Sequence, residues 1–342
     1  MEDFNANRNI IKRDIMLLAI AIPTYQRPEL LLKTLRSVCH QITGRTDVGV
    51  YIYDDSDGRE NSRSIDVARC EFPLAFIEYS INEKNLGIDE NIKRCLDSTS
   101  AEYVWLLGED DLLTDGAIPR TLEAIQKYRP AFIFENYIYA DDQHRRFSNS
   151  AVLQEGRGTY LQGFNDFISD YAWAIGFIGG CVVRAADWRR QRLGAFVGTY
   201  YSHVGGIIGA CLDLEIVVIG DIQVLNRAED IGTFTWSSRT FEVYFSFYEV
   251  LRNSRLSERP QLLNSALRSA ARLFNVYSLV WLGAKRADGV YNIEIYRGYY
   301  RSSLKRSWLW KAVALLISLL PRSPLRWVRY FHLKRRFLRI SI

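Results

Sequence analysis

The sequence predicts an α/β protein in which helices cover both faces of a mainly parallel sheet. Strand-like and helix-like segments alternate four times within the first 125 residues, which is typical of such sheets. The chain of 342 residues is long enough to bury a core, and its hydrophobic fraction of 48% is ordinary for a folded protein. Three of the expected strands end in polar loops, and ligands collect at the carboxyl ends of strands in parallel sheets.

The first half of the chain supplies the parallel part of this sheet. A continuous apolar run at 16–22 stops at Pro23 and predicts a buried strand. Apolar residues spaced at i, i+4 and i+7 predict a helix at 28–38, and Pro28 suits its first turn. The remaining elements are expected as strands at 48–53, 74–79 and 102–107 and as a helix at 89–96.

The pattern changes after residue 131. A β-rich run at 131–140 leads into a polar turn, and an apolar run at 175–183 predicts a buried strand. The pair Gly179-Gly180 indicates that the backbone of this strand approaches another part of the protein closely. The last expected elements are a strand at 214–219 and two helices at 241–283, with Pro260 near the start of the second.

Charge is distributed unevenly along the chain. The formal net charge is +5, but residues 301–342 carry 11 Lys or Arg and no acid, so the first 300 residues are acidic. This asymmetry predicts an acidic partner for the end of the chain only. The five cysteines are scattered, which argues against a zinc site or a disulfide framework and fits a reducing cytosol. The polar N-terminus predicts no signal peptide, and the most apolar window, 308–320, is too short to span a bilayer.

One polar strand end carries three successive acids. The strand expected at 102–107 is followed by Gly108 and then by Glu109, Asp110 and Asp111. Crowded carboxylates repel one another unless something positive lies among them. Their hard oxygen atoms suit Mg²⁺ or Mn²⁺, particularly where the phosphates of a substrate supply the other ligands. The alternative is an acidic turn that caps the following helix.

Four short motifs follow one another along the chain: A-I-P-T-Y-Q-R at 21–27, Y-D-D-S-D at 53–57, N-L-G-x-x-x-N at 85–91 and W-L-L-G-E-D-D at 105–111. With these motifs, the chain resembles the inverting nucleotide-sugar glycosyltransferases of glycosyltransferase family 2. The similarity is closest to abequosyltransferase-like enzymes of bacterial O-antigen biosynthesis, and it covers about the first 235 residues. The resemblance implies the GT-A fold, which is Rossmann-like with a mainly parallel sheet.

The resemblance also implies a divalent metal, Mg²⁺ or Mn²⁺, at the acidic strand end, where it would neutralise the departing nucleoside diphosphate. Asp110 and Asp111 are the implied metal residues, and Glu109 lies beside them. Gly108 stands where the D-x-D signature of the family has its first acid, so contacts with the ribose are expected to differ.

The nucleotide is expected at the ends of the first two strands. Asp55 occupies the position that pairs with the nucleobase in the family, with Asp54 beside it, although an Asx-type turn would also explain these acids. Tyr25 would stack on the base or else belong to the core. The residues expected to bind the nucleotide are Pro23, Tyr25, Asp54, Asp55, Asn85, Gly87, Asn91, Glu109 and Arg227.

The catalytic base is the least defined part of the expected site. An inverting transfer needs a group that takes the proton of the acceptor hydroxyl. Most relatives place an acidic pair at the start of a helix, where this chain has the Tyr-Tyr-Ser-His segment 200–203. His203 is one candidate base, but it could equally be a ligand of metal or phosphate, or a buried histidine. Asp230 is the other candidate, as base or third metal ligand, and surface ion pairing is the alternative for Asp230 and Arg227.

The expected domain organisation has three parts. Residues 1–238 form the glycosyltransferase domain, with a nucleotide-binding half at 14–125 and an acceptor half at 126–238; a helical subdomain at 239–300 and a basic tail at 301–342 follow. In the tail, aromatic side chains fall opposite arginines on a helix, which is typical of an amphipathic segment on an anionic membrane surface. Packing of this tail on the catalytic domain is the alternative. Its bulky aromatic residues argue against a nucleic-acid partner.

Together these features predict an inverting glycosyltransferase that moves a sugar, with a deoxyhexose as one candidate, from a nucleotide-diphosphate sugar to a lipid-linked oligosaccharide. It would be a cytoplasmic protein, peripheral on the inner face of the cell membrane, in surface-polysaccharide or O-antigen biosynthesis. A non-catalytic nucleotide-sugar-binding or scaffold protein is the alternative, because the acidic pair is missing at 200–203. A nucleotidyltransferase is disfavoured, because no Gly-rich, basic phosphate loop follows the first strand.

Overall fold

The computed structural model describes residues 16–56, 59–141, 143–227, 239–273, 276–301 and 306–326. Its strands are β1 (Leu18–Thr24), β2 (Val48–Asp54), β3 (Ile77–Ile81), β4 (Tyr103–Leu106), β5 (Leu112–Leu113), β6 (Phe132–Ala140), β7 (Arg146–Ala151), β8 (Thr159–Gly163), β9 (Cys181–Arg184) and β10 (Glu215–Arg227). Within the described residues they form one sheet in the order β3-β2-β1-β4-β9-β6-β10-β5, with β7 beside β6 and β8 beside β10.

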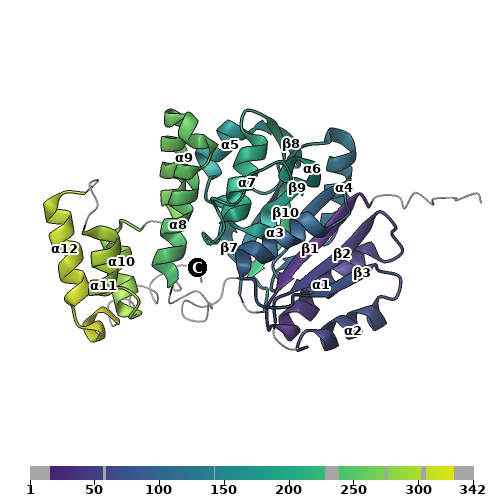
Figure 1. Ribbon diagram of the computed structural model, residues 1–342, viewed down its shortest axis with the longest axis horizontal. Helices are drawn as coiled ribbons and strands as arrows, with labels where there is room; N and C mark the ends of the chain where they lie inside the picture. Colours follow the sequence, from purple (N-terminus) through teal and green to yellow (C-terminus); the bar gives the residue numbers. More distant parts are fainter. Residues whose placement is uncertain are drawn as a thin grey trace, which may run out of the picture.

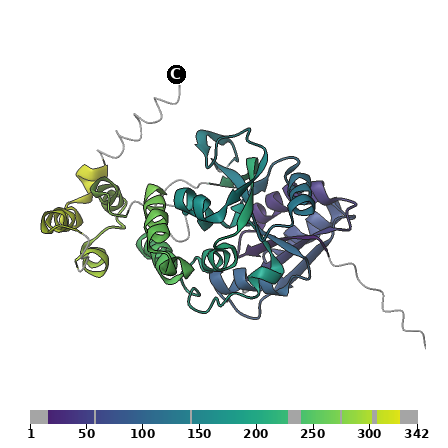
Figure 2. The same ribbon diagram turned by 90° about the horizontal axis from the view of Figure 1, so that it is seen from above.

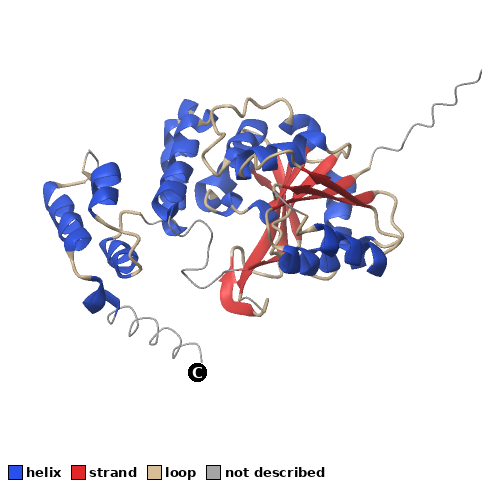
Figure 3. Ribbon diagram, turned by 60° about the horizontal axis from the view of Figure 1, so that its bottom comes forward, coloured by secondary structure: helices blue, strands red, loops and turns tan. Residues whose placement is uncertain are grey.

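Helices lie on both sides of this sheet (Figures 1 and 3). The helices of the catalytic region are α1 (Pro28–Ile42), α2 (Ser62–Glu71), α3 (Ile88–Ser98), α4 (Ala117–Tyr128), α5 (Phe164–Tyr171), α6 (Ala185–Trp188) and α7 (Ser202–Cys211). The C-terminal helices are α8 (Thr240–Asn253), α9 (Pro260–Leu273), α10 (Leu279–Ala287), α11 (Ile293–Ile295) and α12 (Trp308–Leu319). Pro28 is at the first turn of α1 and Pro260 begins α9, so both predictions are confirmed.

The first four strands are parallel, as the sequence predicts. The chain proceeds from β1 through β2 to β3 on one side of β1 and then returns to β4 on its other side. Because such crossovers are right-handed, α3 lies on the opposite face from α1 and α2. The reversal places the topological switch point of the sheet at the carboxyl ends of β1 and β4, which is where open sheets of this kind bind ligands.

The strand expected at 175–183 is wrong in its first part. Residues 174–180 form two 3₁₀ turns, η1 (Ala174–Gly176) and η2 (Ile178–Gly180), and the chain becomes a strand only at β9. The indole nitrogen of Trp105 donates to the carbonyl of Gly179 at 2.8 Å, and a Cβ on Gly180 would lie 3.3 Å from the carbonyl oxygen of Glu135. The close approach expected for the glycine pair is therefore confirmed. It occurs in a 3₁₀ turn and not in a strand, and the apolar run in the sequence does not distinguish the two.

Buried apolar residues form two clusters. The main cluster fills the space between the sheet and its helices and includes side chains of α8 and α9. The second cluster joins α10, α11 and α12 to the start of α8 through Phe241, and these three helices form a separate group beside α8 (Figure 2). Among the described residues, no helix has both the length and the apolarity needed to cross a membrane.

Candidate active site

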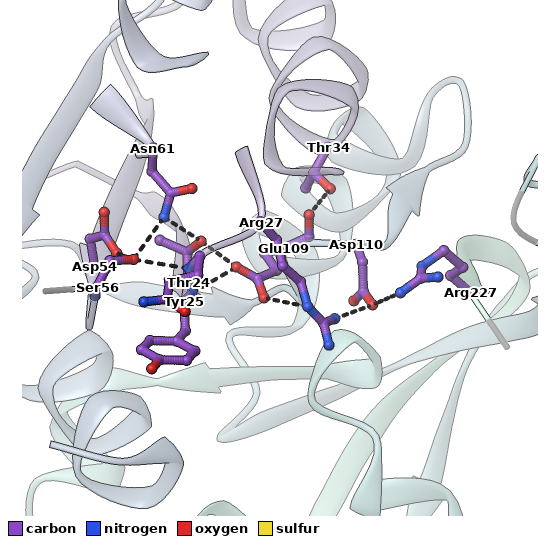
Figure 4. Close-up of polar contacts among 11 residues, drawn as sticks. Thr24, Tyr25, Arg27, Thr34, Asp54, Ser56, Asn61, Glu109, Asp110 and Arg227 are labelled. Carbon is purple, nitrogen blue, oxygen red and sulfur yellow. Dashed lines mark hydrogen bonds and ion pairs between the residues drawn. The ribbon is translucent and has the colours of Figure 1, made fainter. Parts of the chain in front are cut away.

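The three-acid turn lies at the carboxyl ends of β1 and β4. Figure 4 shows side chains from three segments that meet there: the loop after β1, the loop after β4 and the end of β10. The short strand β5 follows the acids directly, and α4 begins only at Ala117 with Gly116 as its N-cap. The acids therefore do not cap a helix, and this alternative is wrong.

Glu109 joins the loop after β4 to the end of β1. One carboxylate oxygen accepts hydrogen bonds from the hydroxyl of Thr24 and from the backbone N–H of Tyr25, the latter at 2.8 Å. The other oxygen lies 3.5 Å from the guanidinium of Arg27. Burial raises the pKa of Glu109 to about 7 in spite of these donors. Glu109 thus fixes the two strand ends relative to each other.

Asp110 is the acid whose charge is balanced by two arginines. Its Oδ2 lies 3.0 Å from Nη1 of Arg27 and 2.8 Å from Nη2 of Arg227 (Figure 4). The side chain of Asp110 is 22% exposed, whereas that of Arg227 is nearly buried. His144, in the turn between β6 and β7, places Nε2 at 3.2 Å from the backbone carbonyl of Asp110. The site therefore combines one accessible carboxylate with two guanidinium groups.

Asp111 connects the acidic turn to the end of β10 from a buried position. Its carboxylate is buried and accepts a hydrogen bond from the backbone N–H of Arg227 at 3.1 Å. Burial, and then the neighbouring carboxylate of Asp110, raise the pKa of Asp111 well above its ordinary value. The hydroxyl of Thr34 on α1 contacts the carbonyls of Glu109 and Asp111, each at 2.8 Å, and holds the turn against α1.

The described residues contain no group of three or more His, Cys, Asp or Glu side chains that could hold a metal ion. A Cβ on Gly108 would lie 2.3 Å from Oδ2 of Asp111, so the carboxylate of Asp111 fills the space of the missing first acid. Asp110 is the acid with an accessible oxygen. A hard cation at this place would have a carboxylate oxygen of Asp110 as its ligand from these acids and would take its other ligands from phosphates and water.

The acids at the end of β2 are held by neutral donors. Asp54 is fully buried and accepts hydrogen bonds from the backbone and hydroxyl of Ser56 and from the hydroxyl of Tyr79, at 2.6 to 2.9 Å. Asp55 accepts from the side chain of Asn82 and from two backbone N–H groups of the loop before α3, at 2.5 to 3.0 Å. These contacts favour the turn-closing role for Asp54. Asp55 connects the end of β2 to the loop before α3.

The segment 82–91 is held by hydrogen bonds to the end of β2 and by hydrogen bonds within itself. Gly87 has a positive φ of 78° and donates its N–H to Asp55 at 2.9 Å and to the side chain of Asn85 at 2.9 Å. Asn91 is buried and donates to the carbonyl of Tyr53 at 2.9 Å. Gly87 is needed here because the left-handed region disfavours residues with a Cβ. Asn91 therefore supports the loop from the protein interior.

The two aromatic or cyclic residues expected around a base differ in exposure. Pro23 is buried within β1, whereas Tyr25 is 41% exposed directly after it. The backbone N–H of Asp55 donates to the carbonyl of Thr24 at 2.9 Å, so Tyr25 lies beside the end of β2. An exposed ring at a strand end agrees with a stacking surface and argues against a place in the core.

His203 lies in the protein interior. It is 1% exposed, its Nε2 is 3.1 Å from the carbonyl of Ile175, and burial lowers its pKa to about 4. Asp89 of α3 accepts hydrogen bonds from the backbone N–H groups of Tyr200 and Ser202, at 2.7 and 3.0 Å, and so caps the start of α7. Of the three alternatives for His203, these observations favour the buried histidine. Asp230 lies outside the described residues.

Sequence reasoning missed several residues of this site. Arg27 is the last residue of the first motif, at the end of a predicted strand. Its positive charge is the one signal that could have identified it as a partner for the acids. Thr24 and Thr34 are common residue types without a local signal. His144 reaches Asp110 through the hairpin of β6 and β7, and nothing in the sequence indicates that contact.

Comparison with known families decides the class of this domain. The family described as Glycosyl transferase family 2 matches residues 19–188, which include the strand ends β1, β2 and β4. Residues 19–188 therefore form a glycosyl transferase family 2 domain. The abequosyltransferase RfbV of Salmonella typhimurium is 32% identical in an alignment of 205 residues that covers 55% of this chain. The alignment spans only 59% of the length of that relative.

Solved structures share the fold of this protein at low sequence identity. Residues 1–349 of TarS from S. aureus align with a TM-score of 0.58 and 14% identity, over 80% of this chain and 81% of that one. The same fragment in complex with UDP-GlcNAc aligns with a TM-score of 0.56 and 15% identity, over 75% and 73%. The mannosyltransferase PcManGT from Pyrobaculum calidifontis, in complex with GDP-Man and Mn²⁺, aligns at 0.50 and 14%, over 88% and 86%. The GT-A fold expected from the sequence is confirmed.

Proposed function

We propose that this protein is a metal-dependent, inverting glycosyltransferase that moves a sugar from a nucleotide-diphosphate sugar to a lipid-linked oligosaccharide. A deoxyhexose is a candidate for the sugar, and surface-polysaccharide or O-antigen biosynthesis is the proposed context. The observation that carries the proposal is Asp110 between Arg27 and Arg227 at the switch point of the sheet. The abequosyltransferase relative and the fold shared with a UDP-GlcNAc complex support it.

The arginines are the proposed diphosphate ligands. In the ligand-free protein Arg27 and Arg227 share one carboxylate oxygen of Asp110, so both guanidinium groups are already aimed at the same point. A diphosphate arriving there offers more acceptor oxygens than one carboxylate does, and guanidinium forks bind phosphate oxygens well. A divalent cation, when bound, would neutralise charge that develops on the leaving diphosphate. Asp110 would hold it, while Asp111 and Glu109 keep the loop in place.

The nucleoside is proposed to lie across the ends of β1 and β2. The exposed ring of Tyr25 offers a stacking surface for the base. Asp55 lies beside it, although its carboxylate is engaged by the loop 82–87. Base recognition would therefore use the oxygen Oδ2 of Asp55, which accepts a hydrogen bond from the backbone N–H of Gly87, together with backbone groups of this loop.

The base that deprotonates the acceptor is proposed to be Asp230 instead of His203. Asp230 follows Arg227 by three residues in the sequence, and Arg227 already belongs to the site. His203 is enclosed by the core, and a base must be within hydrogen-bond reach of the acceptor hydroxyl. We assign His203 a structural role at the start of α7.

Peripheral association with the inner face of the cell membrane is also proposed. The described part of the basic tail predicted at 301–342 is residue 301 and residues 306–326, and the arginines at 301, 306, 322 and 326 within it are exposed. Exposed arginines with no acid among them favour an anionic surface. A lipid-linked acceptor would be presented there.

A turnover assay separates the enzyme from the non-catalytic nucleotide-sugar-binding protein. Wild-type protein is incubated with a panel of UDP-, GDP-, CDP- and dTDP-sugars, and release of the nucleoside diphosphate is measured with Mn²⁺, with Mg²⁺ and after chelation. The proposal expects hydrolysis of at least one donor that stops on chelation and returns with metal. Saturable binding of a donor without turnover of any would instead support the scaffold.

A further inference from the structure

The helix α12 carries apolar side chains around most of its circumference, with Lys311 as its one charged residue, but it is buried on one side only. Ala314 and Ser318 are buried against the second core cluster, and the carbonyl of Ala314 accepts a hydrogen bond from the hydroxyl of Tyr291 at 3.0 Å. Trp310 packs against Tyr300 with ring centroids 5.6 Å apart. A helix that is apolar all round is normally buried on all sides. Its opposite side therefore needs an explanation.

We define the outer face of α12 as its exposed large apolar side chains. They are exposed by 42% to 79%, and they are Trp308, Leu309, Leu316, Leu319 and Leu320. At about 100° per residue, these five positions fall within a sector of about 120°, opposite Ala314 and Ser318. The outer face is thus one continuous apolar stripe, and contiguous stripes of this kind mark interaction sites.

Basic residues lie at both ends of α12. Exposed Arg306 and Arg322 flank the helix, and Lys311 is half-buried within it. Arg306 stacks over the rings of Tyr277 and Trp310, at 4.7 and 5.6 Å from their centroids, and these contacts hold it at the N-terminal end of α12. In residues 276–326 the sequence has nine Lys or Arg and only two acids, whereas the first 300 residues are acidic overall. The positive charge is therefore local to this helical group.

We propose that the outer face of α12 is the surface that docks on an anionic lipid bilayer, with the helix lying parallel to the membrane in its interfacial region. A helix of 12 residues is about 18 Å long, which is too short to cross the hydrocarbon core. An apolar stripe with Trp at one end and flanking arginines matches both the acyl boundary and the anionic headgroups. This inference deepens the proposed membrane association and does not depend on the transfer chemistry.

Charge also decides between lipid and the other occupants of this face. A second copy of the chain, packed through the same face, would bring the arginines of both copies together, and like charges across an interface oppose association. The segment 327–342 has five Lys or Arg and no acid, so it would bring positive charge as well. An anionic bilayer complements both features, because its acyl chains accept the apolar stripe and its headgroups attract the arginines at the ends of α12.

The docking face is connected to the catalytic domain through aromatic stacking. Phe245 of α8 stacks on Tyr299 with centroids 4.7 Å apart and an interplanar angle of 17°. Phe241 of α8 packs edge-on against Trp281 of α10 at 5.0 Å. Because α8 belongs also to the main core, docking through α12 would fix the catalytic domain relative to the membrane.

The test is co-sedimentation of the full chain with vesicles of phosphatidylcholine alone and of phosphatidylcholine with phosphatidylglycerol. The variant Leu316→Gln/Leu319→Gln changes two exposed side chains and keeps good helix formers. Its matched control is Leu74→Gln/Leu214→Gln, which changes two exposed leucines elsewhere. The proposal expects binding to anionic vesicles at least about tenfold weaker for the α12 variant, because buried apolar area sets the strength of interfacial binding. The control should bind like wild type.

Two further readouts keep the outcomes distinct. Release of nucleoside diphosphate in solution should be unchanged in the α12 variant, and inactivity of the wild type would contradict the transfer proposal without affecting the vesicle result. Sedimentation equilibrium without vesicles should give the same mass for variant and wild type. Unchanged vesicle binding by the variant overturns the proposal. So does equal wild-type binding to neutral vesicles, or a wild-type dimer that the variant dissociates.

Discussion

The carboxyl ends of β2 and β4 both present adjacent acids, yet the protein holds them in different ways. At β2, Asp54 and Asp55 are almost fully buried and accept hydrogen bonds from neutral groups. At β4, Asp110 lies between two guanidinium groups and keeps part of its carboxylate exposed. Neutral donors close a turn, whereas guanidinium groups can exchange the carboxylate for the oxygen atoms of a diphosphate. The partners of an acid, more than its place at a strand end, indicate which turn is the reactive one.

The largest effect is expected for Asp110→Asn. Turnover of the accepted donor should fall on the order of 1,000-fold, because the accessible carboxylate that would hold the cation is lost. Thermal unfolding should stay close to that of wild type, since the side chain of Asp110 is partly exposed and the amide oxygen of an asparagine can still accept hydrogen bonds from the two arginines. Asp97→Asn, an exposed acid paired with Lys93, is the control and should retain activity. Retained turnover in Asp110→Asn would remove the distinction between the two strand ends.

Glu135 allows a test of how burial alone changes the pKa of a carboxyl group, because its hydrogen-bond donor is a neutral hydroxyl. Glu135 on β6 is fully buried, accepts a hydrogen bond from Thr121, and has its pKa raised to about 8 by burial. A carboxyl whose pKa is higher in the folded state stabilises below its unfolded pKa, near 4.5, and loses that contribution as the pH rises to about 8. Between pH 5 and pH 7 this amounts to about 3 kcal/mol of unfolding free energy.

The measurement is denaturant unfolding of Glu135→Gln and wild type at several pH values. The variant should be less sensitive to pH between 5 and 8, so its stability relative to wild type should increase across that range. Glu123→Gln, on the exposed side of α4, should follow wild type. Parallel pH profiles for Glu135→Gln and wild type would contradict the burial argument.

Asp54→Asn should separate structure from chemistry at β2. An amide cannot accept the three hydrogen bonds in the same way, and the unfolding free energy should fall by about 2 kcal/mol. Turnover per folded molecule should change little, because the carboxylate offers no surface to a ligand. Chemical denaturation and a donor assay on the folded fraction give the two values. A specific loss of turnover with normal stability would place Asp54 in the donor site.

Arg27→Met should give the smallest effect. Loss of one of the two guanidinium groups should raise the KM for the donor about tenfold, which corresponds to about 1.4 kcal/mol. The kcat should change less, since Asp110 and Arg227 remain. Arg36→Met on α1, whose guanidinium pairs with Glu71 at the surface, is the control. An unchanged KM would show that Arg27 serves only to balance Asp110.

The sequence predicts the parallel half of the fold well because its strands are continuous apolar runs. β1, β2 and β4 lie within a few residues of their expected positions, whereas β3 starts three residues late. The short strand β5 and the edge strands β7 and β8 carry too few apolar residues to be recognised. The run at 175–180 is apolar because it is buried, and its turns depend on contacts with Trp105 and Glu135.

The candidate site was only partly predictable. Its location follows from the three polar strand ends, but the contacts between them depend on tertiary structure. Arg227 comes from β10 and Arg27 from the loop after β1, and both reach the same oxygen of Asp110. Local sequence also could not predict that Asp54 and Asp110 have different roles, because their partners come from distant parts of the chain. Asp54 accepts from the hydroxyl of Tyr79, whereas Asp110 pairs with two guanidinium groups.

The most direct test is a crystal structure of the protein with Mn²⁺ and the nucleoside diphosphate of the donor that it accepts. The account predicts the cation on Asp110, the diphosphate within hydrogen-bond distance of Arg27 or Arg227, and the base against the ring of Tyr25. Asp54 should keep its contacts with Ser56 and Tyr79 unchanged. A diphosphate bound away from the ends of β1 and β4, or a cation held by acids other than Asp110, would contradict it.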